Sequence, residues 1–326
     1  MAWTNTIAQR FSRPITVLTL GDSRANGWRN TPDVGVTDRN QLFGDRVAQL
    51  LRAHLGLPTG GRGWIPMSLD GYSVDGTGGC DYPLPTQDGN VVVPDWAESW
   101  ANVPGAHSLL LDDDPIRIPI GAGCTSVEFY GVNTNPGGWT VTMTGESTGT
   151  ATVTNADSPY INISSGSLAA PGSWVELQCT TLPTGNDCVA LGCIEYAGDE
   201  DFGIRPLTWG VAGITAVSAQ SWVGDTINSK LYDALGGVDL VIVELGANDA
   251  ADDSTPADVT AAITNMTGAA PLSVVLTAPP AKYTDEDDLP EWSTINEAIA
   301  AADYTWLVDL AARGQFADAI IEALPS

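Results

Sequence analysis

The sequence predicts an α/β fold with a parallel sheet, interrupted by an inserted antiparallel β-sandwich. Apolar strands alternate with helical patterns toward both ends of the 326-residue chain, which is typical of βαβ units. Short Thr- and Val-rich runs separated by turns occupy the middle, which is typical of a sandwich or jelly roll. The length also favours two domains over one.

The first part of the chain predicts a strand, a turn and a helix. The apolar run 15–20 follows Pro14 and predicts a buried strand. From residue 40 to 55 apolar side chains recur at helical spacing, and Pro58 then ends the helix. Residues 61–100 are Gly-rich and show no periodic pattern, so no long regular element is expected there.

The middle of the chain predicts the β-sandwich. Its strands alternate apolar and polar residues between Gly- and Pro-containing turns, and no helical pattern interrupts them. The expected strands are 116–118, 125–130, 140–144, 175–179 and 189–195. The predicted division is therefore a discontinuous α/β domain, residues 1–95 and 203–326, and an inserted jelly-roll-like domain, residues 96–202.

Helices and strands alternate again after residue 203. The expected helices are 223–235, 256–266, 289–302 and 316–324, and the expected strands are 238–245, 272–278 and 304–310. Alternation at this spacing predicts parallel strands joined by helical crossovers.

Charge and composition exclude several classes of partner. Forty acidic and 13 basic residues give a net charge of −27, which repels nucleic acid and anionic membranes. No apolar run reaches transmembrane length, and no secretory signal is expected at the N-terminus. No phosphate loop, dinucleotide motif or zinc helix is present, so no cofactor and no metal are expected.

The five cysteines are an odd number and do not form a complete disulfide framework. Cys179 and Cys193 stand on the apolar phase of their strands, which predicts buried thiols. A Cys188–Cys193 bridge or a metal site remains an alternative.

Three short motifs stand where predicted strands end. Ser23 follows the first strand in Gly-Asp-Ser, and Asn248 and Asp249 follow a later strand in Gly-x-Asn-Asp. Between them, the segment 207–216 (LTWGVAGITA) contains Gly213. Ligands of open parallel sheets bind at the carboxyl ends of strands, so these residues are expected at one site. Each motif alone is also compatible with an ordinary turn or a helix cap.

Together and in this order, the motifs resemble blocks I, II and III of the SGNH (GDSL-type) hydrolases. The resemblance covers the α/β portion and implies a flavodoxin-like three-layer fold around a parallel sheet. It implies that Ser23 occupies the nucleophile position. The amides of Ser23 and Gly213 and the side chain of Asn248 would then form the oxyanion hole.

Charged residues next to these motifs are candidate binding residues. Arg24 stands where the family often has Leu, and it either binds a substrate carboxylate or faces solvent. Asp22 and Asp249 flank the expected nucleophile and oxyanion positions. Either carboxylate is a weak general base at an ordinary pKa.

The family's C-terminal Asp-x-x-His, which supplies the general base, is not found in this sequence. The strand around 306–310 is followed almost at once by the closing helix 316–324, so the loop that would carry the motif is expected to be deleted. Asp309 matches a structural aspartate of the family and not the catalytic one. A serine hydroxyl without an adjacent base is a poor nucleophile.

Only two histidines are available as substitutes. His54 lies among leucines in the predicted helix 40–55, where packing or exposure at its rim is expected. His107 stands where the chain enters the insert, which is expected to fold over the site, so His107 is a candidate substitute base.

These observations leave two hypotheses for function. The favoured hypothesis is a catalytically impaired SGNH-like protein that binds cell-envelope glycan. The alternative is an active serine esterase or deacetylase that uses a non-standard base on acylated carbohydrate or lipid. The plan of the chain also resembles SGNH-like tail and virion proteins of actinobacterial phages. That resemblance implies a virion location with other virion proteins as partners, and a cytoplasmic location is the alternative.

Overall fold

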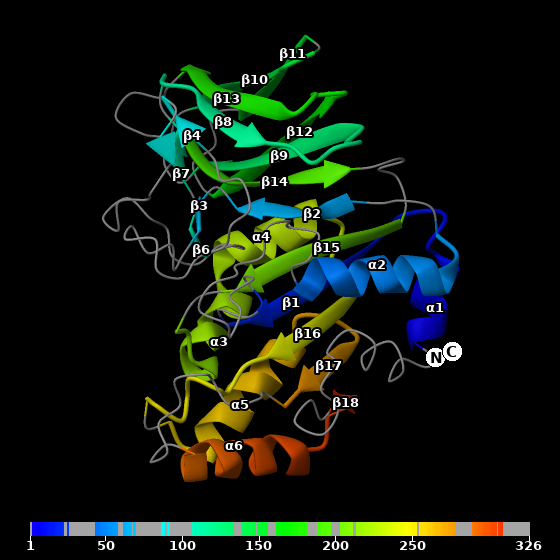
Figure 1. The fold of residues 1–326 in the computed structure, drawn as a ribbon, viewed down its shortest axis with the longest axis vertical. Coiled ribbons are helices and arrows are strands. Elements are labelled where there is room, and N and C mark those ends of the chain that lie inside the picture. Colours follow the sequence, from blue (N-terminus) through cyan, green and yellow to red (C-terminus); the bar gives the residue numbers. More distant parts are fainter. Residues whose placement is uncertain are drawn as a thin grey trace.

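The protein has an α/β portion and a β-sandwich portion, stacked along its longest axis (Figure 1). The computed structural model describes residues 2–22, 25, 43–57, 61–66, 68–69, 86–88, 90–91, 106–107, 109–111, 113–133, 138–147, 149–155, 161–181, 188–196, 203–210, 213–252, 254–277, 289–304 and 306–308. The expected closing helix 316–324 and Asp309 lie outside these residues.

The α/β portion is built on a parallel five-stranded sheet of order β15-β1-β16-β17-β18. These strands are β1 (Pro14–Gly21), β15 (Gly203–Gly210), β16 (Leu240–Glu244), β17 (Ser273–Leu276) and β18 (Leu307–Val308). The chain passes from β1 to β15 on one side and then to β16 on the other side of β1. This is the flavodoxin-like order, and the reversal at β1 creates a topological switch point. The predicted fold class is confirmed.

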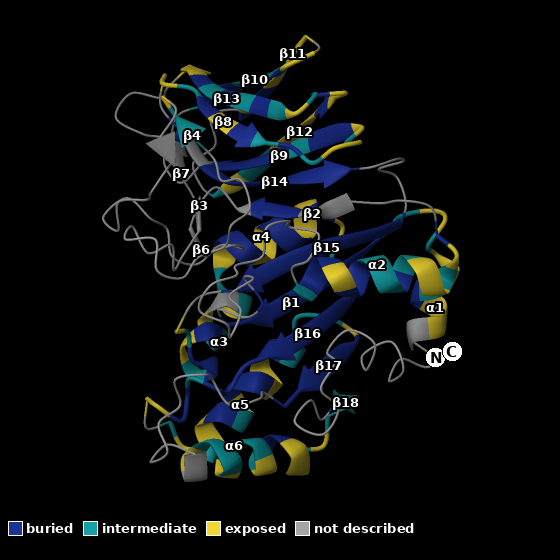
Figure 2. Ribbon diagram, in the orientation of Figure 1, coloured by how far each residue is buried: buried dark blue, intermediate teal, exposed yellow. Residues whose placement is uncertain are grey.

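The two faces of this sheet are buried by different helices, because side chains alternate along each strand. On one face, Val17 and Ile242 pack with residues of α2 (Phe43–Leu55). On the other face, Leu18 and Val241 pack with the helices that follow β15, β16 and β17. These helices are α3 (Ala216–Gly224), α4 (Thr226–Ala234), α5 (Pro256–Thr267) and α6 (Leu289–Ala301). The sheet is thus the middle of three layers (Figure 2).

Two features of the helices differ from the sequence expectation. The helix expected at 223–235 is confirmed as α4 but begins three residues later, at Thr226, and α3 before it had no sequence prediction. Asp225 has an extended backbone, and its carboxylate accepts the amides of Ile227 and Asn228 at 2.8 and 3.3 Å, which starts a new helix. A short helix, α1 (Ala2–Ala8), also precedes β1 and had no sequence prediction.

The insert consists of two antiparallel sheets with a shared apolar core. The outer sheet has the order β11-β10-β13-β8-β4-β5, and the inner sheet has the order β12-β9-β14-β2, with β7 also paired to β14. The strands are β2 (Gly61–Pro66), β3 (Ser68–Leu69), β4 (Thr86–Gln87), β5 (Asn90–Val91), β6 (Ala106–His107), β7 (Leu109–Leu111), β8 (Ile116–Pro119), β9 (Ser126–Asn133), β10 (Trp139–Gly145), β11 (Thr150–Asn155), β12 (Asn162–Ala169), β13 (Trp174–Thr181) and β14 (Cys188–Tyr196); β3 and β6 form a separate ribbon.

The core between the two sheets contains the cysteines assigned to it by strand phase. Cys179 and Cys193 are buried there as thiols, and Cys193 is not in the alternative bridge to Cys188. Phe129 and Trp139 meet edge to face in the same core, with ring centroids 6.3 Å apart.

Strands from before residue 95 complete the sandwich. β2 pairs antiparallel with β14, and β4 pairs with β8. Segments in the Gly-rich region, where no long element was expected, therefore supply strands to the insert's sheets. The exact division into domains stays a prediction.

The two portions share one apolar core and are not joined by linkers alone. Trp64 of β2 and Tyr130 of β9 lie in the same buried cluster as Trp209 of β15. The Trp64 ring lies against Gly192, where an added Cβ would be 2.2 Å from the indole. The sandwich therefore covers β15, the outer strand of the parallel sheet, with buried apolar surface (Figure 2).

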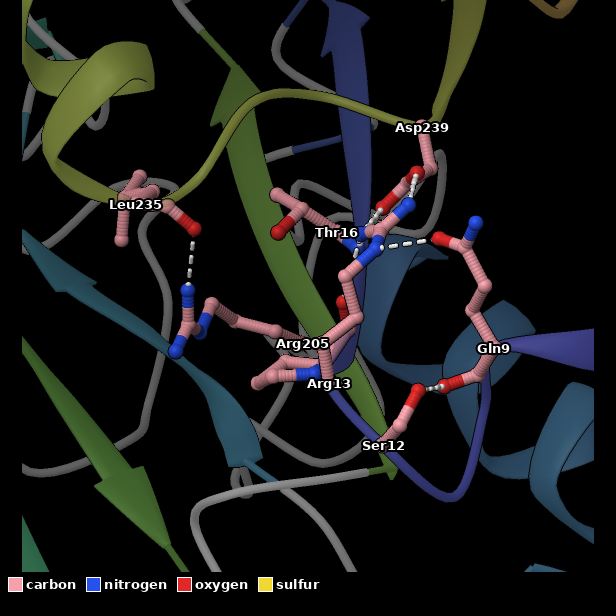
Figure 3. A network of polar contacts seen from close by, with 8 residues as sticks. Gln9, Ser12, Arg13, Thr16, Arg205, Leu235 and Asp239 are labelled. Atoms are coloured by element: carbon pink, nitrogen blue, oxygen red, sulfur yellow. Dashed lines mark hydrogen bonds and ion pairs between the residues drawn. The ribbon is translucent and has the colours of Figure 1, made fainter. Parts of the chain in front are cut away.

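A polar network fixes the amino ends of the central strands (Figure 3). Asp239, just before β16, accepts the Thr16 amide of β1 at 2.9 Å and the Arg13 guanidinium at 2.8 Å. Arg205 of β15 donates to the carbonyl oxygen of Leu235 at 2.7 Å. These bonds tie β1, β15 and the chain entering β16 together at the edge opposite the motifs.

Candidate functional site

The three motif-bearing loops begin at one edge of the sheet. Gly21, the last residue of β1, is in register with Gly210 of β15 on one side and with Glu244 of β16 on the other. All three strands run parallel, so the residues that follow them emerge from neighbouring carboxyl ends. The first and last motifs are more than 220 residues apart in sequence, yet the sheet brings the starting points of all three together.

The turn after β1 requires a glycine. A Cβ on Gly21 would lie 2.5 Å from the Cβ of Ala25, a distance that real side chains essentially never adopt. The chain therefore folds back on itself directly after the strand, and Asp22 and Ala25 are buried in that turn. Ser23 and Arg24, between them in sequence, lie outside the described residues.

The loop after β15 presents an open backbone at Gly213. This residue is exposed and has φ +74°, in the left-handed region that favours glycine. A Cβ placed here would meet nothing within 4 Å, so the glycine is required by backbone conformation and not by crowding.

The loop after β16 is tied to the loop after β15 by Asn248. Its Nδ2 donates to the carbonyl oxygen of Ile214 at 2.9 Å, and the side chain is half-buried. An amide nitrogen carries two hydrogens, so this bond leaves one donor available for another acceptor. Gly246 sets up the loop with φ +116°, packed 3.1 Å from Ile299 at the position that a Cβ would take.

Asp249 joins the same two loops and is fully buried. Its carboxylate accepts the amides of Ala216 at 2.8 Å and Val217 at 3.4 Å, at the start of α3. Burial raises the pKa of this carboxyl above its ordinary value, while these two hydrogen bonds act in the opposite direction. The expected binding residue thus directs its oxygens at helix amides.

The two histidines lie in different places. His54 is exposed near the end of α2, two residues after Arg52, which donates to the carbonyl oxygen of Ile204. The strand from Ile204 to Gly210 is about 20 Å long, so His54 lies near the amino end of β15 and away from the motif loops. The backbone of His107 forms β6, paired to β3, and its side chain lies outside the described residues.

Three polar side chains near this edge had no sequence prediction. Glu244 ends β16 and is 1% exposed, with Oε2 at 3.3 Å from where a Cβ of Gly21 would stand. Thr19 and Thr208 are buried on the α2 face. Their hydroxyls lie against Gly44, where a Cβ would be 2.8 and 2.3 Å away, respectively. A glutamate inside the apolar run Val241–Leu245 was the available signal for Glu244.

The structure thus brings together the loops of Gly213, Asn248 and Asp249 beside Asp22, and the roles assigned to them stay predictions. Within the described ranges, no group of three or more His, Cys, Asp or Glu side chains is placed to hold a metal ion. No helix in the described part of the chain is long and apolar enough to cross a membrane.

Comparison with solved structures identifies the fold. A peptidoglycan O-acetylesterase aligns with a TM-score of 0.58 over 92% of this chain and 80% of its own, at 16% identity. The chain has the fold of an SGNH-like esterase with an inserted β-rich region.

Other comparisons are weaker. A family two carbohydrate esterase from Clostridium thermocellum aligns with a TM-score of 0.25 over 64% of this chain and 84% of its own, at 10% identity. A CBM35 from Cellvibrio japonicus aligns at 0.27 over 37% of this chain and 96% of its own, at 11% identity. Neither score is high enough to define the fold. No protein-family model matches the sequence, and no curated protein matches it significantly.

Proposed function

We propose that this protein binds acylated cell-envelope glycan at the carboxyl edge of β15, β1 and β16, through an SGNH-type acyl site whose hydrolysis is impaired. One observation supports the site above all. Gly21 is in register with both Gly210 and Glu244, so three sequence motifs separated by long stretches of chain start at one edge. The similarity to a peptidoglycan O-acetylesterase supports an acylated glycan as the ligand.

The proposed acyl site uses one residue from each loop. The ester carbonyl lies next to the Ser23 hydroxyl, and its oxygen accepts hydrogen bonds from the Gly213 amide and the remaining Nδ2 hydrogen of Asn248. If Ser23 attacks, a bond forms from Oγ to the carbonyl carbon and the ester C–O bond breaks. The sugar hydroxyl then leaves with a proton. Each oxyanion donor of this type contributes about 3–4 kcal/mol to the transition state.

The proposed impairment concerns the proton that Ser23 must lose. Arg52, two residues before His54, binds Ile204, which is about 20 Å of strand from Gly210, so His54 is not expected to reach the Ser23 hydroxyl. Removing the histidine from a Ser-His-Asp system lowers turnover about a millionfold. Ground-state binding uses the same donors without this proton transfer, so it persists when turnover is lost.

An active esterase is the second candidate, and two features of the loops that carry Gly213 and Asn248 support it. Gly213 has the positive φ of a special turn, and Asn248 retains a donor. In the view of Figure 1, β6, which contains His107, lies on the side toward which β1 and β15 point. In this candidate His107 accepts the Ser23 proton.

A binding and turnover comparison tests the proposal. Wild type and Ser23→Ala are titrated by calorimetry with O-acetylated peptidoglycan fragments and with the same fragments after chemical deacetylation. We expect both proteins to prefer the acetylated fragments, with acetate release no faster than from Ser23→Ala. Equal affinity for both fragments, or no binding, would contradict the site. Ser23-dependent acetate release at an enzymatic rate would select the second candidate.

The proposed setting is a virion tail, where the chain contacts a glycan surface beside other virion proteins. The acidic, Lys-poor composition and the sequence resemblance to phage proteins support this setting. Detection of the chain by mass spectrometry in gradient-purified particles is the expected result. Its confinement to host-cell extract would support the cytoplasmic alternative.

A further inference from the structure

Asn248 and Asp249 hold the block II loop at two neighbouring points. Asn248 Nδ2 binds the carbonyl oxygen of Ile214, and the Asp249 carboxylate binds the amides of Ala216 and Val217. The two side chains are consecutive in sequence, and their bonds lie one to four residues after Gly213. The position of the Gly213 backbone relative to β16 is therefore set by this pair of residues.

We call the bonds from Asn248 and Asp249 to the block II loop the clamp. The clamp and one local cap bind the amides of residues 216–218 at the amino end of α3. The amides of Ala216 and Val217 go to Asp249, and the amide of Ser218 goes to the Thr215 hydroxyl at 3.1 Å. The Ala219 amide makes the first helical bond, to the Thr215 carbonyl oxygen at 2.9 Å. Thr215 is the N-cap residue of α3 itself, whereas Asp249 belongs to the loop after β16.

We propose that Asp249 is a positioning residue for the acyl site: it fixes the Gly213 amide and the Asn248 side chain on the same carbonyl oxygen. This inference rests on the proposed function, and it assigns Asp249 a role that acts through other residues and not by touching the ligand. Full burial and two amide bonds keep its oxygens directed away from a bound ester. A misplacement of about 1 Å at a reacting centre costs about 100-fold in rate.

Asp225 provides a matched control. It also accepts two amides at the start of a helix, those of Ile227 and Asn228 at 2.8 and 3.3 Å. It caps α4 and contacts neither the block II loop nor the loop after β16 in these bonds. Asp225 accepts both amides with one oxygen, Oδ1, which asparagine would keep, so the matched change is Asp225→Ala. Asp249→Asn replaces one of the two oxygens that accept the amides of Ala216 and Val217. Both changes remove an acceptor at a helix start, and only Asp249→Asn affects the clamp.

Three measurements on wild type, Asp249→Asn and Asp225→Ala test this role. They are thermal unfolding, the affinity for a non-reactive phosphonate analogue of the acetyl ester, and hydrogen exchange of the amides of residues 213–217. We expect both variants to lose stability. Only Asp249→Asn is expected to bind the analogue about 100-fold more weakly and to exchange faster at residues 213–217.

Two outcomes would overturn the role. One is unchanged affinity for the analogue and unchanged exchange in Asp249→Asn. The other is an equal loss of affinity in Asp225→Ala, because a stability effect alone would then explain both. If wild type does not bind the analogue, the acyl site of the proposed function fails. The hydrogen-exchange comparison then still decides whether Asp249 fixes the loop.

Discussion

Substitution of Asn248 should separate an effect on protein stability from an effect on the acyl site. In Asn248→Ala, the bond from Nδ2 to the Ile214 carbonyl oxygen is lost. A neutral hydrogen bond contributes about 1 kcal/mol net, and the half-buried site lets water reach the freed carbonyl. The free energy of unfolding is therefore expected to fall by about 1 kcal/mol.

The effect on the acyl site is expected to be much larger than that. Removing one oxyanion donor typically lowers the rate about 100- to 1,000-fold, or about 3–4 kcal/mol of transition-state stabilisation. Affinity for a non-reactive phosphonate analogue of the acetyl ester, measured by calorimetry, reports this stabilisation without proton transfer from Ser23, and urea unfolding measures stability. Both are measured on the same preparations at the same pH.

Asn265→Ala is the control for this comparison. Asn265 Nδ2 also makes one neutral hydrogen bond, to Gln220 Oε1 at 3.1 Å, on an exposed part of α5. It is expected to lose no more than about 1 kcal/mol of stability and none of the affinity for the analogue. The reasoning would be refuted if Asn248→Ala binds the analogue as tightly as wild type, or if both variants lose affinity equally.

Three further predictions concern the same edge of the sheet. Gly246→Ala is expected to destabilise by about 2–4 kcal/mol in urea unfolding, since φ +116° is strained for alanine and Ile299 lies 3.1 Å from the new Cβ; a loss below 1 kcal/mol would contradict this packing. His54→Gln is expected to leave the affinity for the analogue unchanged, whereas His107→Gln abolishes any Ser23-dependent hydrolysis of p-nitrophenyl acetate if the active-esterase candidate holds. Because the pKa of Asp249 is raised in the folded state, its carboxyl stabilises the fold most below about pH 4. The stability of wild type relative to Asp249→Asn should therefore fall as the pH rises above that value. An increase in this relative stability with pH would contradict a raised pKa.

Local patterns predicted the parallel sheet because its strands are buried on both faces. Runs such as 15–20 and 238–245 are continuously apolar, and their observed bounds, Pro14–Gly21 and Leu240–Glu244, agree closely. The order of the strands follows from the resemblance of the motifs and not from any single run.

Elements without a strong apolar pattern were not predicted. β12 (Asn162–Ala169) is rich in serine and mostly exposed, so its alternation is weak. β2 pairs with β14 from more than 120 residues away, and no local pattern encodes such a pairing. The start of α4 had a local signal, a capping aspartate after glycine at Asp225, whereas α3 before it was not predicted.

The candidate site was also predicted from the sequence only in part. Glycines and the Asn-Asp pair could be identified as special by their place after strands. The partners of Asn248 and Asp249 are backbone groups of another loop, and any sequence supplies those, so the clamp was not predictable.

The most direct test is a crystal structure of the protein with an O-acetylated peptidoglycan fragment bound. The acetyl carbonyl oxygen is expected about 2.7–3.1 Å from both the Gly213 nitrogen and Asn248 Nδ2, with the ester bond intact. A fragment whose acetyl group faces solvent, or one bound elsewhere on the protein, would contradict an acyl-binding edge at β15, β1 and β16.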